Sequence, residues 1–170
     1  MSPSLQHTIR LRAVPFNITI GQLYASTSDY DDNEIEEFYD QLQNVIDQTL
    51  KKDILVVQGD WNAKVGRDAC RNWQGIGGPC CNDDTNERGL RLLEFTTFND
   101  LVLAKTFGHQ KASEDGPGIA KMDNTTTRLI TFLVRKRFQS GVNIVRTQSF
   151  PGADIGSNHD LLMITFHLRL

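Results

Sequence analysis

The chain has 170 residues, which suggests one domain, and its 39% hydrophobic and 23% charged residues are ordinary for a soluble globular protein. The formal net charge of −3 excludes a general attraction to nucleic acid or to an anionic membrane. Because no run of roughly 18 apolar residues occurs, the sequence predicts no membrane-spanning helix.

The first third of the chain alternates between strand-like and helix-like patterns. Residues 1–12 are polar and lack an apolar segment, so we expect no signal peptide and an intracellular location, nuclear or cytoplasmic. Residues 16–24 alternate apolar and polar side chains, which predicts a half-buried strand. A helix with Asp31 or Asp32 as its N-cap should follow, because apolar residues recur at helical spacing at Ile35, Phe38, Tyr39, Leu42, Val45 and Ile46.

A buried strand is expected at Ile54–Gln58, and it leads into Gly59-Asp60-Trp61-Asn62. The order strand, helix, strand predicts an α/β layered fold. Open α/β sheets bind their ligands at the carboxyl ends of the strands. Asp60 and Asn62 would point the same way from an extended segment and could hold a hard metal ion or a polarised water. The alternative is a polar strand end without a chemical role.

The second half of the chain contains fewer regular patterns. Residues 66–85 include Cys70, Cys80 and Cys81 and predict a long surface loop; the odd cysteine count indicates neither a disulfide framework nor a zinc site, and favours a reducing compartment. Asn86 can cap a second helix that runs to Phe98. Four further strands are expected at residues 101–104, 129–134, 142–145 and 161–170, and residues 109–127 show no pattern.

One basic cluster stands out, formed by Arg135-Lys136-Arg137 together with Arg146. It is the sequence's candidate for a contact with nucleic acid. A solvated surface without a partner is the other interpretation of these charges.

Three segments together resemble a known family. They are Gly59-Asp60-Trp61-Asn62-Ala63-Lys64-Val65-Gly66, then Asn86-Glu87-Arg88-Gly89, then Gly152-Ala153-Asp154-Ile155-Gly156-Ser157-Asn158-His159. In this order they resemble the endonuclease/exonuclease/phosphatase superfamily. More narrowly, they resemble the endonuclease domain of non-LTR (LINE-like) retrotransposons and the retroelement-derived sequences called craniofacial development protein 2-like. The resemblance extends from Ile9 to Leu170.

The resemblance implies a four-layer α/β sandwich and metal-dependent hydrolysis of a phosphodiester in DNA. Asp60 would activate the attacking water, Asn62 would steady the water or the phosphate, Tyr24 would touch the phosphate, and His159 would be the catalytic imidazole. The implied cofactor is Mg²⁺ or Mn²⁺, with Asp60, Asn62 and Asn158 as its ligands.

The chain departs from the family's pattern in ways that bear on activity. The family's N-terminal portion, with an Asn and a metal-binding Glu, has no counterpart, so an unpaired sheet edge and an uncovered apolar face are expected. The family's Asp before the catalytic His is Asn158, which carries no charge and should bind a cation weakly. Counting back from Leu133-Val134, the carboxylate that orients that His is replaced by Ile130. The tract Glu114 to Phe132 does not resemble the family, and we treat residues 110–128 as a divergent loop.

These observations lead to one preferred function and two alternatives. We expect residues 1–170 to form a single partial domain, a truncated four-layer α/β sandwich, in which metal-dependent hydrolysis of DNA is weak or lost and metal binding is impaired. One alternative is a non-catalytic interaction module that keeps part of the fold. The other is an active Mg²⁺-dependent nuclease completed by another chain. The sequence leaves the oligomeric state open and predicts no membrane partner.

Overall fold

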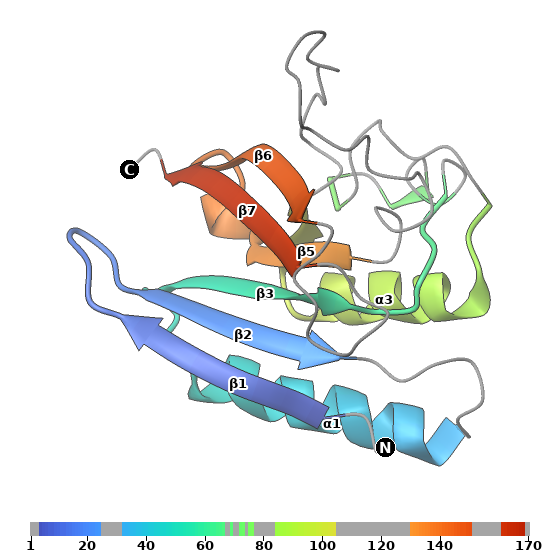
Figure 1. Ribbon diagram of the computed structural model, residues 1–170. Helices are drawn as coiled ribbons and strands as arrows, with labels where there is room; N and C mark the ends of the chain where they lie inside the picture. The colour runs from blue at the N-terminus through green and yellow to red at the C-terminus, as the bar shows by residue number, and fades with distance from the viewer. Residues whose placement is uncertain are drawn as a thin grey trace, which may run out of the picture.

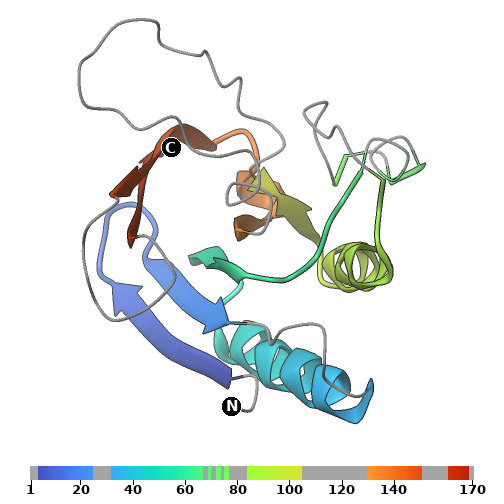
Figure 2. The same ribbon diagram turned by 45° about the vertical axis from the view of Figure 1, so that its right-hand side comes forward.

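The computed structural model describes residues 4–24, 32–66, 69, 72–73, 75–76, 84–104, 130–150 and 161–168. Two helices, α1 (Asp32–Gln48) and α3 (Glu87–Phe98), lie along one face of a five-stranded sheet (Figure 1). A separate two-stranded sheet of β6 (Val142–Phe150) and β7 (Leu161–Leu168) lies on the side of the five-stranded sheet away from the helices (Figure 2). Within the described residues, no helix is long and apolar enough to cross a membrane.

The five-stranded sheet has the order β1-β2-β3-β5-β4. Its strands are β1 (Ser4–Leu11), β2 (Ile18–Tyr24), β3 (Ile54–Asp60), β5 (Ile130–Arg135) and β4 (Leu101–Leu103). Only β2 and β3 pair in parallel, and α1 connects them, as expected for a β-α-β unit. The other neighbours pair antiparallel, so β5 starts where β3 ends.

The helix-facing side of the sheet holds the larger core cluster. Leu55 and Val57 of β3 project into it, together with Leu133 of β5. The predicted stripe of α1 is confirmed: Phe38, Tyr39, Leu42 and Ile46 are buried, and Ile35 packs against the cluster. An ion pair between Arg91 and Glu36 joins the two helices at the surface.

The opposite face of the sheet is also buried over β3, β5 and β4, which corrects the expectation of an uncovered apolar face there. Ile54 and Val56 of β3 lie in this second cluster with Phe132 and Val134 of β5. These side chains are at most 4% exposed. The second cluster ends at β2 and β1, where Ile9 is 57% and Leu11 is 45% exposed. The uncovered part of the face is therefore confined to this end of the sheet.

A strand that the sequence analysis missed forms one edge of the sheet. β1 pairs antiparallel with β2 along its whole length, with one irregularity between Leu5 and His7. Its sequence alternates Leu5, His7, Ile9 and Leu11 with polar residues, which is a strand-like period that the overall polarity of residues 1–12 concealed. Among the described strands, none pairs with the outer side of β1, so the predicted unpaired edge lies there.

The remaining elements follow the predictions closely. The α/β class and the partial two-sheet arrangement are confirmed, and the strands differ from expectation mainly in length, since β3 extends to Asp60 and β6 to Phe150. The loop expected at the surface contributes Ala69 and Ile76 to the core, so it is not wholly a surface segment. The divergent loop at 110–128 lies outside the described residues.

Candidate functional site

Three strands bring their ends together at the predicted site. Asp60, the last residue of β3, is paired with Tyr24 at the end of β2 and with Ile130 at the start of β5. The three positions form one row across the sheet, with Asp60 in the middle. The row therefore brings together the predicted residues Tyr24 and Asp60 and includes Ile130, the position at which the resemblance implied a lost carboxylate.

The chain leaves the strand conformation immediately after Asp60. Asn62 has a left-handed backbone with φ of 46°, a conformation that asparagine tolerates better than most residues. Its backbone N–H donates to Oδ1 of Asp60 over 3.0 Å. The expectation that Asp60 and Asn62 share one face of an extended strand is therefore wrong, because β3 ends at Asp60. One carboxylate oxygen already accepts a bond from the turn.

Packing on both sides fixes the position of this turn. Trp61 is 3% exposed, and its ring meets Phe38 of α1 edge to face with centroids 6.0 Å apart. Gly59 permits the close approach of β2, since a Cβ at this position would lie 2.1 Å from the carbonyl oxygen of Leu23. Residues 60–62, the Asp60 corner, are thus built on the hydrophobic core rather than on a mobile surface segment.

The motif Asn86-Glu87-Arg88-Gly89 holds the segment that follows the Asp60 corner. Oδ1 of Asn86, the N-cap of α3, accepts from the N–H of Gly89 over 2.8 Å and from the N–H of Lys64 over 2.9 Å. The N–H of Asn86 donates to the carbonyl oxygen of Lys64 over 3.1 Å. A Cβ at Gly89 would lie 1.9 Å from that same oxygen, so only glycine fits. The predicted cap is confirmed, and its link to Lys64 is a role that the sequence did not suggest.

A further bond closes this attachment. The N–H of Gly66 donates to Oγ1 of Thr85 over 2.9 Å. Residues 64–66 therefore run beside the start of α3 as a bonded unit. The spacing of Asn86 and Gly89 was the only hint of this arrangement, because its partners lie about twenty residues earlier in the chain.

The described residues do not fit a divalent cation on their own. Among them, no group of three or more His, Cys, Asp or Glu side chains is placed to hold a metal. At the corner, the described donors are the carboxylate of Asp60 and the amide of Asn62, whereas Mg²⁺ and Ca²⁺ take about six oxygen ligands. The predicted residues Asn158 and His159 lie outside the described residues, and Tyr24 is placed only by its backbone.

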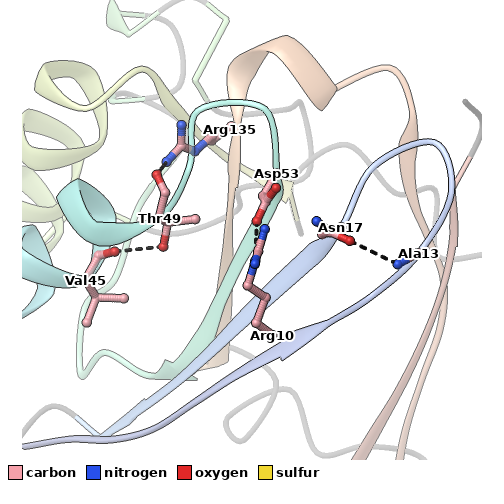
Figure 3. A network of polar contacts seen from close by, with 7 residues as sticks. All are labelled: Arg10, Ala13, Asn17, Val45, Thr49, Asp53 and Arg135. Atoms are coloured by element: carbon pink, nitrogen blue, oxygen red, sulfur yellow. Dashed lines mark hydrogen bonds and ion pairs between the residues drawn. The ribbon is translucent and has the colours of Figure 1, made fainter.

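Two arginines of the predicted basic cluster, Arg135 and Arg137, bind backbone carbonyls at the other end of the sheet, and Figure 3 shows the first of them. Nη2 of Arg135 donates to the carbonyl oxygens of Thr49, over 2.9 Å, and Ile46, over 3.3 Å, at the C-terminal end of α1. Nη1 of Arg137 donates to the carbonyl oxygen of Lys51 over 3.2 Å. The carboxyl end of a helix favours such cations. Arg135 is thus committed to the helix end and away from the Asp60 corner.

Solved structures with a similar arrangement define the class of fold. The endonuclease domain of TRAS1, a telomere-specific non-LTR retrotransposon, matches 96% of this chain and 63% of its own with a TM-score of 0.55 at 18% identity. An endonuclease/exonuclease/phosphatase from Beutenbergia cavernae matches 95% of this chain and 38% of its own with a TM-score of 0.52 at 13% identity. The chain therefore has the endonuclease/exonuclease/phosphatase fold.

Sequence comparison finds similar proteins among curated sequences. Craniofacial development protein 2 from Bos taurus is 36% identical over 163 residues, and the protein of the same name from Tragulus javanicus is 35% identical over 163 residues. Each match covers 96% of this chain, which spans only 27–28% of the relatives' length. No family model matches the sequence. The chain is thus similar in sequence to one part of the craniofacial development protein 2 sequences.

Proposed function

We propose that this chain is a retroelement-derived endonuclease-type domain in which phosphodiester hydrolysis is weak or absent. The family reaction would be the metal-dependent hydrolysis of DNA. The residues matched to that reaction are Asp60, Asn62, Tyr24 and His159. Mg²⁺ or Mn²⁺ would be the cofactor, held poorly by Asp60, Asn62 and Asn158.

The observation that carries this proposal is the pairing of Asp60 with Ile130. In the family, the position of Ile130 supplies the carboxylate that orients the catalytic imidazole. Isoleucine has no group that can accept a hydrogen bond from that imidazole. By analogy with the Ser-His-Asp triad, loss of an orienting carboxylate lowers the rate by about 10⁴-fold. The short supply of charged oxygen donors at the corner should lower metal affinity as well.

A plasmid-nicking assay tests the proposal. Purified chain is incubated with supercoiled plasmid in Mg²⁺, in Mn²⁺ and in EDTA, beside the matched Asp60→Ala variant. We expect both proteins to leave nearly all of the plasmid supercoiled in every buffer. Extensive metal-dependent nicking with less than one protein molecule per plasmid, which the Asp60→Ala variant lacks, would overturn the proposal and favour an active nuclease. The double variant Ile130→Asp, Asn158→Asp asks whether the lost carboxylates suffice to restore cleavage.

A non-catalytic role as an interaction module is the second candidate function. The observation that favours it is the exposed apolar end of the sheet at β1, which has no part in the Asp60 corner. Contiguous exposed apolar surface marks sites where proteins bind partners. A fold that loses catalysis can keep such a surface.

A further inference from the structure

The two edges of the five-stranded sheet are protected unequally. At one edge, β4 has three residues, all about 1% exposed, and the N–H of Leu103 donates to the carbonyl oxygen of Ile76 over 2.8 Å. At the other edge, β1 has eight residues, and no described strand pairs with its outer side. Every side chain from His7 to Leu11 is exposed. In an antiparallel pair, part of an edge strand's N–H and C=O groups point outward. β1 also contacts α1. Among the described residues, its exposed stretch His7–Leu11 is therefore the part that can serve as a template for another strand.

The open edge carries an apolar strip on one face. Ile9 is paired with Ile20, and Leu11 is paired with Ile18, so these four side chains lie on the same face of the sheet. Ile18 packs against the second core cluster, which identifies the face as the one away from the helices. The strip thus extends the apolar surface of the second core cluster into a part of the face that is exposed. Ile9 and Leu11 are its exposed members, at 57% and 45%.

The charge of this region is opposite to that of the whole chain. Residues 4–24 contain Arg10 and Arg12 and no Asp or Glu, whereas the chain has a net charge of −3. Both arginines are exposed. Arg10 bonds to Asp53 through Nε over 2.6 Å, and its side chain stays 49% exposed (Figure 3). A strand that pairs here would meet cations beside an apolar strip.

We propose that β1 binds an extended polypeptide strand from a partner protein, with apolar residues that alternate with acidic and small polar ones. Main-chain hydrogen bonds to the outer edge would supply affinity, and the alternation would place apolar side chains over Ile9 and Leu11. A second copy of this chain fits less well, because symmetric pairing of β1 with β1 would oppose like charges. This proposal is independent of whether the Asp60 corner cleaves DNA.

A labelled peptide tests the proposal by fluorescence anisotropy. The probe is an eight-residue peptide, Thr-Val-Glu-Val-Thr-Val-Glu-Val, titrated with the purified chain. We expect saturable binding that weakens by about tenfold or more in the Ile9→Thr, Leu11→Thr variant, which corresponds to about 1.4 kcal/mol. Threonine is β-branched and keeps the strand preference of this edge. The matched control is Leu50→Thr, because Leu50 is 50% exposed but lies outside the sheet.

Two altered peptides separate edge pairing from simple apolar or ionic adsorption. N-methylation of alternate amides removes the donors that face the edge and should abolish binding. Replacement of each Glu by Lys should weaken binding. Circular dichroism verifies that each variant is folded. The proposal is overturned if no saturable binding occurs, if N-methylation or Ile9→Thr, Leu11→Thr leaves affinity unchanged, or if sedimentation shows that β1 mediates a dimer instead.

Discussion

At the scale of single residues, the two motifs that the structure describes, Gly59-Asp60-Trp61-Asn62 and Asn86-Glu87-Arg88-Gly89, are largely explained by backbone contacts. Gly59 and Gly89 each lie against a carbonyl oxygen, of Leu23 and Lys64 respectively, at distances that leave no space for a Cβ. Asn86 satisfies two backbone donors at once. These positions therefore have a role in the fold that does not depend on any chemistry at Asp60. Asp60 is the exception, because its carboxylate accepts one bond, from the N–H of Asn62, and could also take part in chemistry.

Gly59→Ala should lower the free energy of unfolding by about 1–3 kcal/mol, because the new methyl group would collide with the backbone of β2. The matched control is Gly21→Ala in the neighbouring strand, where a Cβ would lie 3.9 Å from the Val57 side chain, an ordinary contact. That change should alter stability by less than about 1 kcal/mol. Urea denaturation of both variants measures the difference. Equal stability of the two variants would contradict the close approach at Gly59.

A buried carboxylate makes the stability of the chain sensitive to acid. The hydrogen bond from Arg10 holds the pKa of Asp53 below its usual range, against the opposing effect of burial. Because the folded pKa is depressed, the stabilisation is present above the unfolded pKa of about 3.9 and is lost as pH falls through the folded value. Asp53→Asn should therefore lower stability most at neutral pH, and its difference from the wild type should shrink below about pH 4.

Urea midpoints at several pH values between 7 and 2 measure this difference. Asp40→Asn, at an exposed position on α1, is the control for loss of a negative charge. A difference between wild type and Asp53→Asn that grows as pH falls would show that the ion pair with Arg10 does not stabilise the folded chain.

At the scale of elements, helix ends act as attachment points for segments distant in sequence. The start of α3 holds residues 64–66, which follow the Asp60 corner. The end of α1 is held by Arg135 at the end of β5. At α3, side chains of Thr85 and Asn86 accept from backbone N–H groups of residues 64–66. At α1, Arg135 donates to carbonyl groups that a helix terminus leaves without partners. The sheet and its helices are thereby joined at both ends of β3.

Asn86→Ala should cost about 1–2 kcal/mol and loosen the Asp60 corner, because the side chain caps α3 and binds Lys64. The spectroscopic reporter is Trp61, with Trp73→Phe as the background. We expect a red shift of Trp61 emission in Asn86→Ala and none in Asn86→Asp, which keeps the acceptor oxygen. Asn99→Ala at the other end of α3 is the control. An unshifted emission in Asn86→Ala would mean that the cap does not position the corner.

At the scale of the whole molecule, one sheet connects two hydrophobic clusters. β3 supplies Leu55 and Val57 to the helix-facing cluster, and Ile54 and Val56 to the opposite one. β5 divides its side chains in the same manner. Because both clusters pack against the same sheet, disruption of that sheet would expose both of them. We therefore expect these parts of the chain to fold as one unit.

We predict that both clusters unfold in one transition. Trp61 reports on the helix-facing cluster in a Trp73→Phe background, and Phe138→Trp reports on the opposite cluster in a background without the native tryptophans. In each protein, fluorescence and far-ultraviolet circular dichroism should give the same urea midpoint. Separate midpoints for the two probes would indicate two folding units and contradict a single domain.

The sequence by itself determined most of the local elements and indicated the class of fold. The spacing of Phe38, Tyr39 and Leu42 specifies a helix, and the run Ile54–Gln58 specifies a buried strand, because these patterns depend only on which neighbours share a face. Three short motifs identified the family. The tertiary structure decided what those patterns could not contain: that Ile130 stands beside Asp60, that Asn86 binds Lys64, and that β1 forms an open edge. Each of these depends on contacts between residues far apart in the chain. Such contacts are fixed by the register of the strands and by the close approach of backbone segments, which arise only when the whole sheet is assembled.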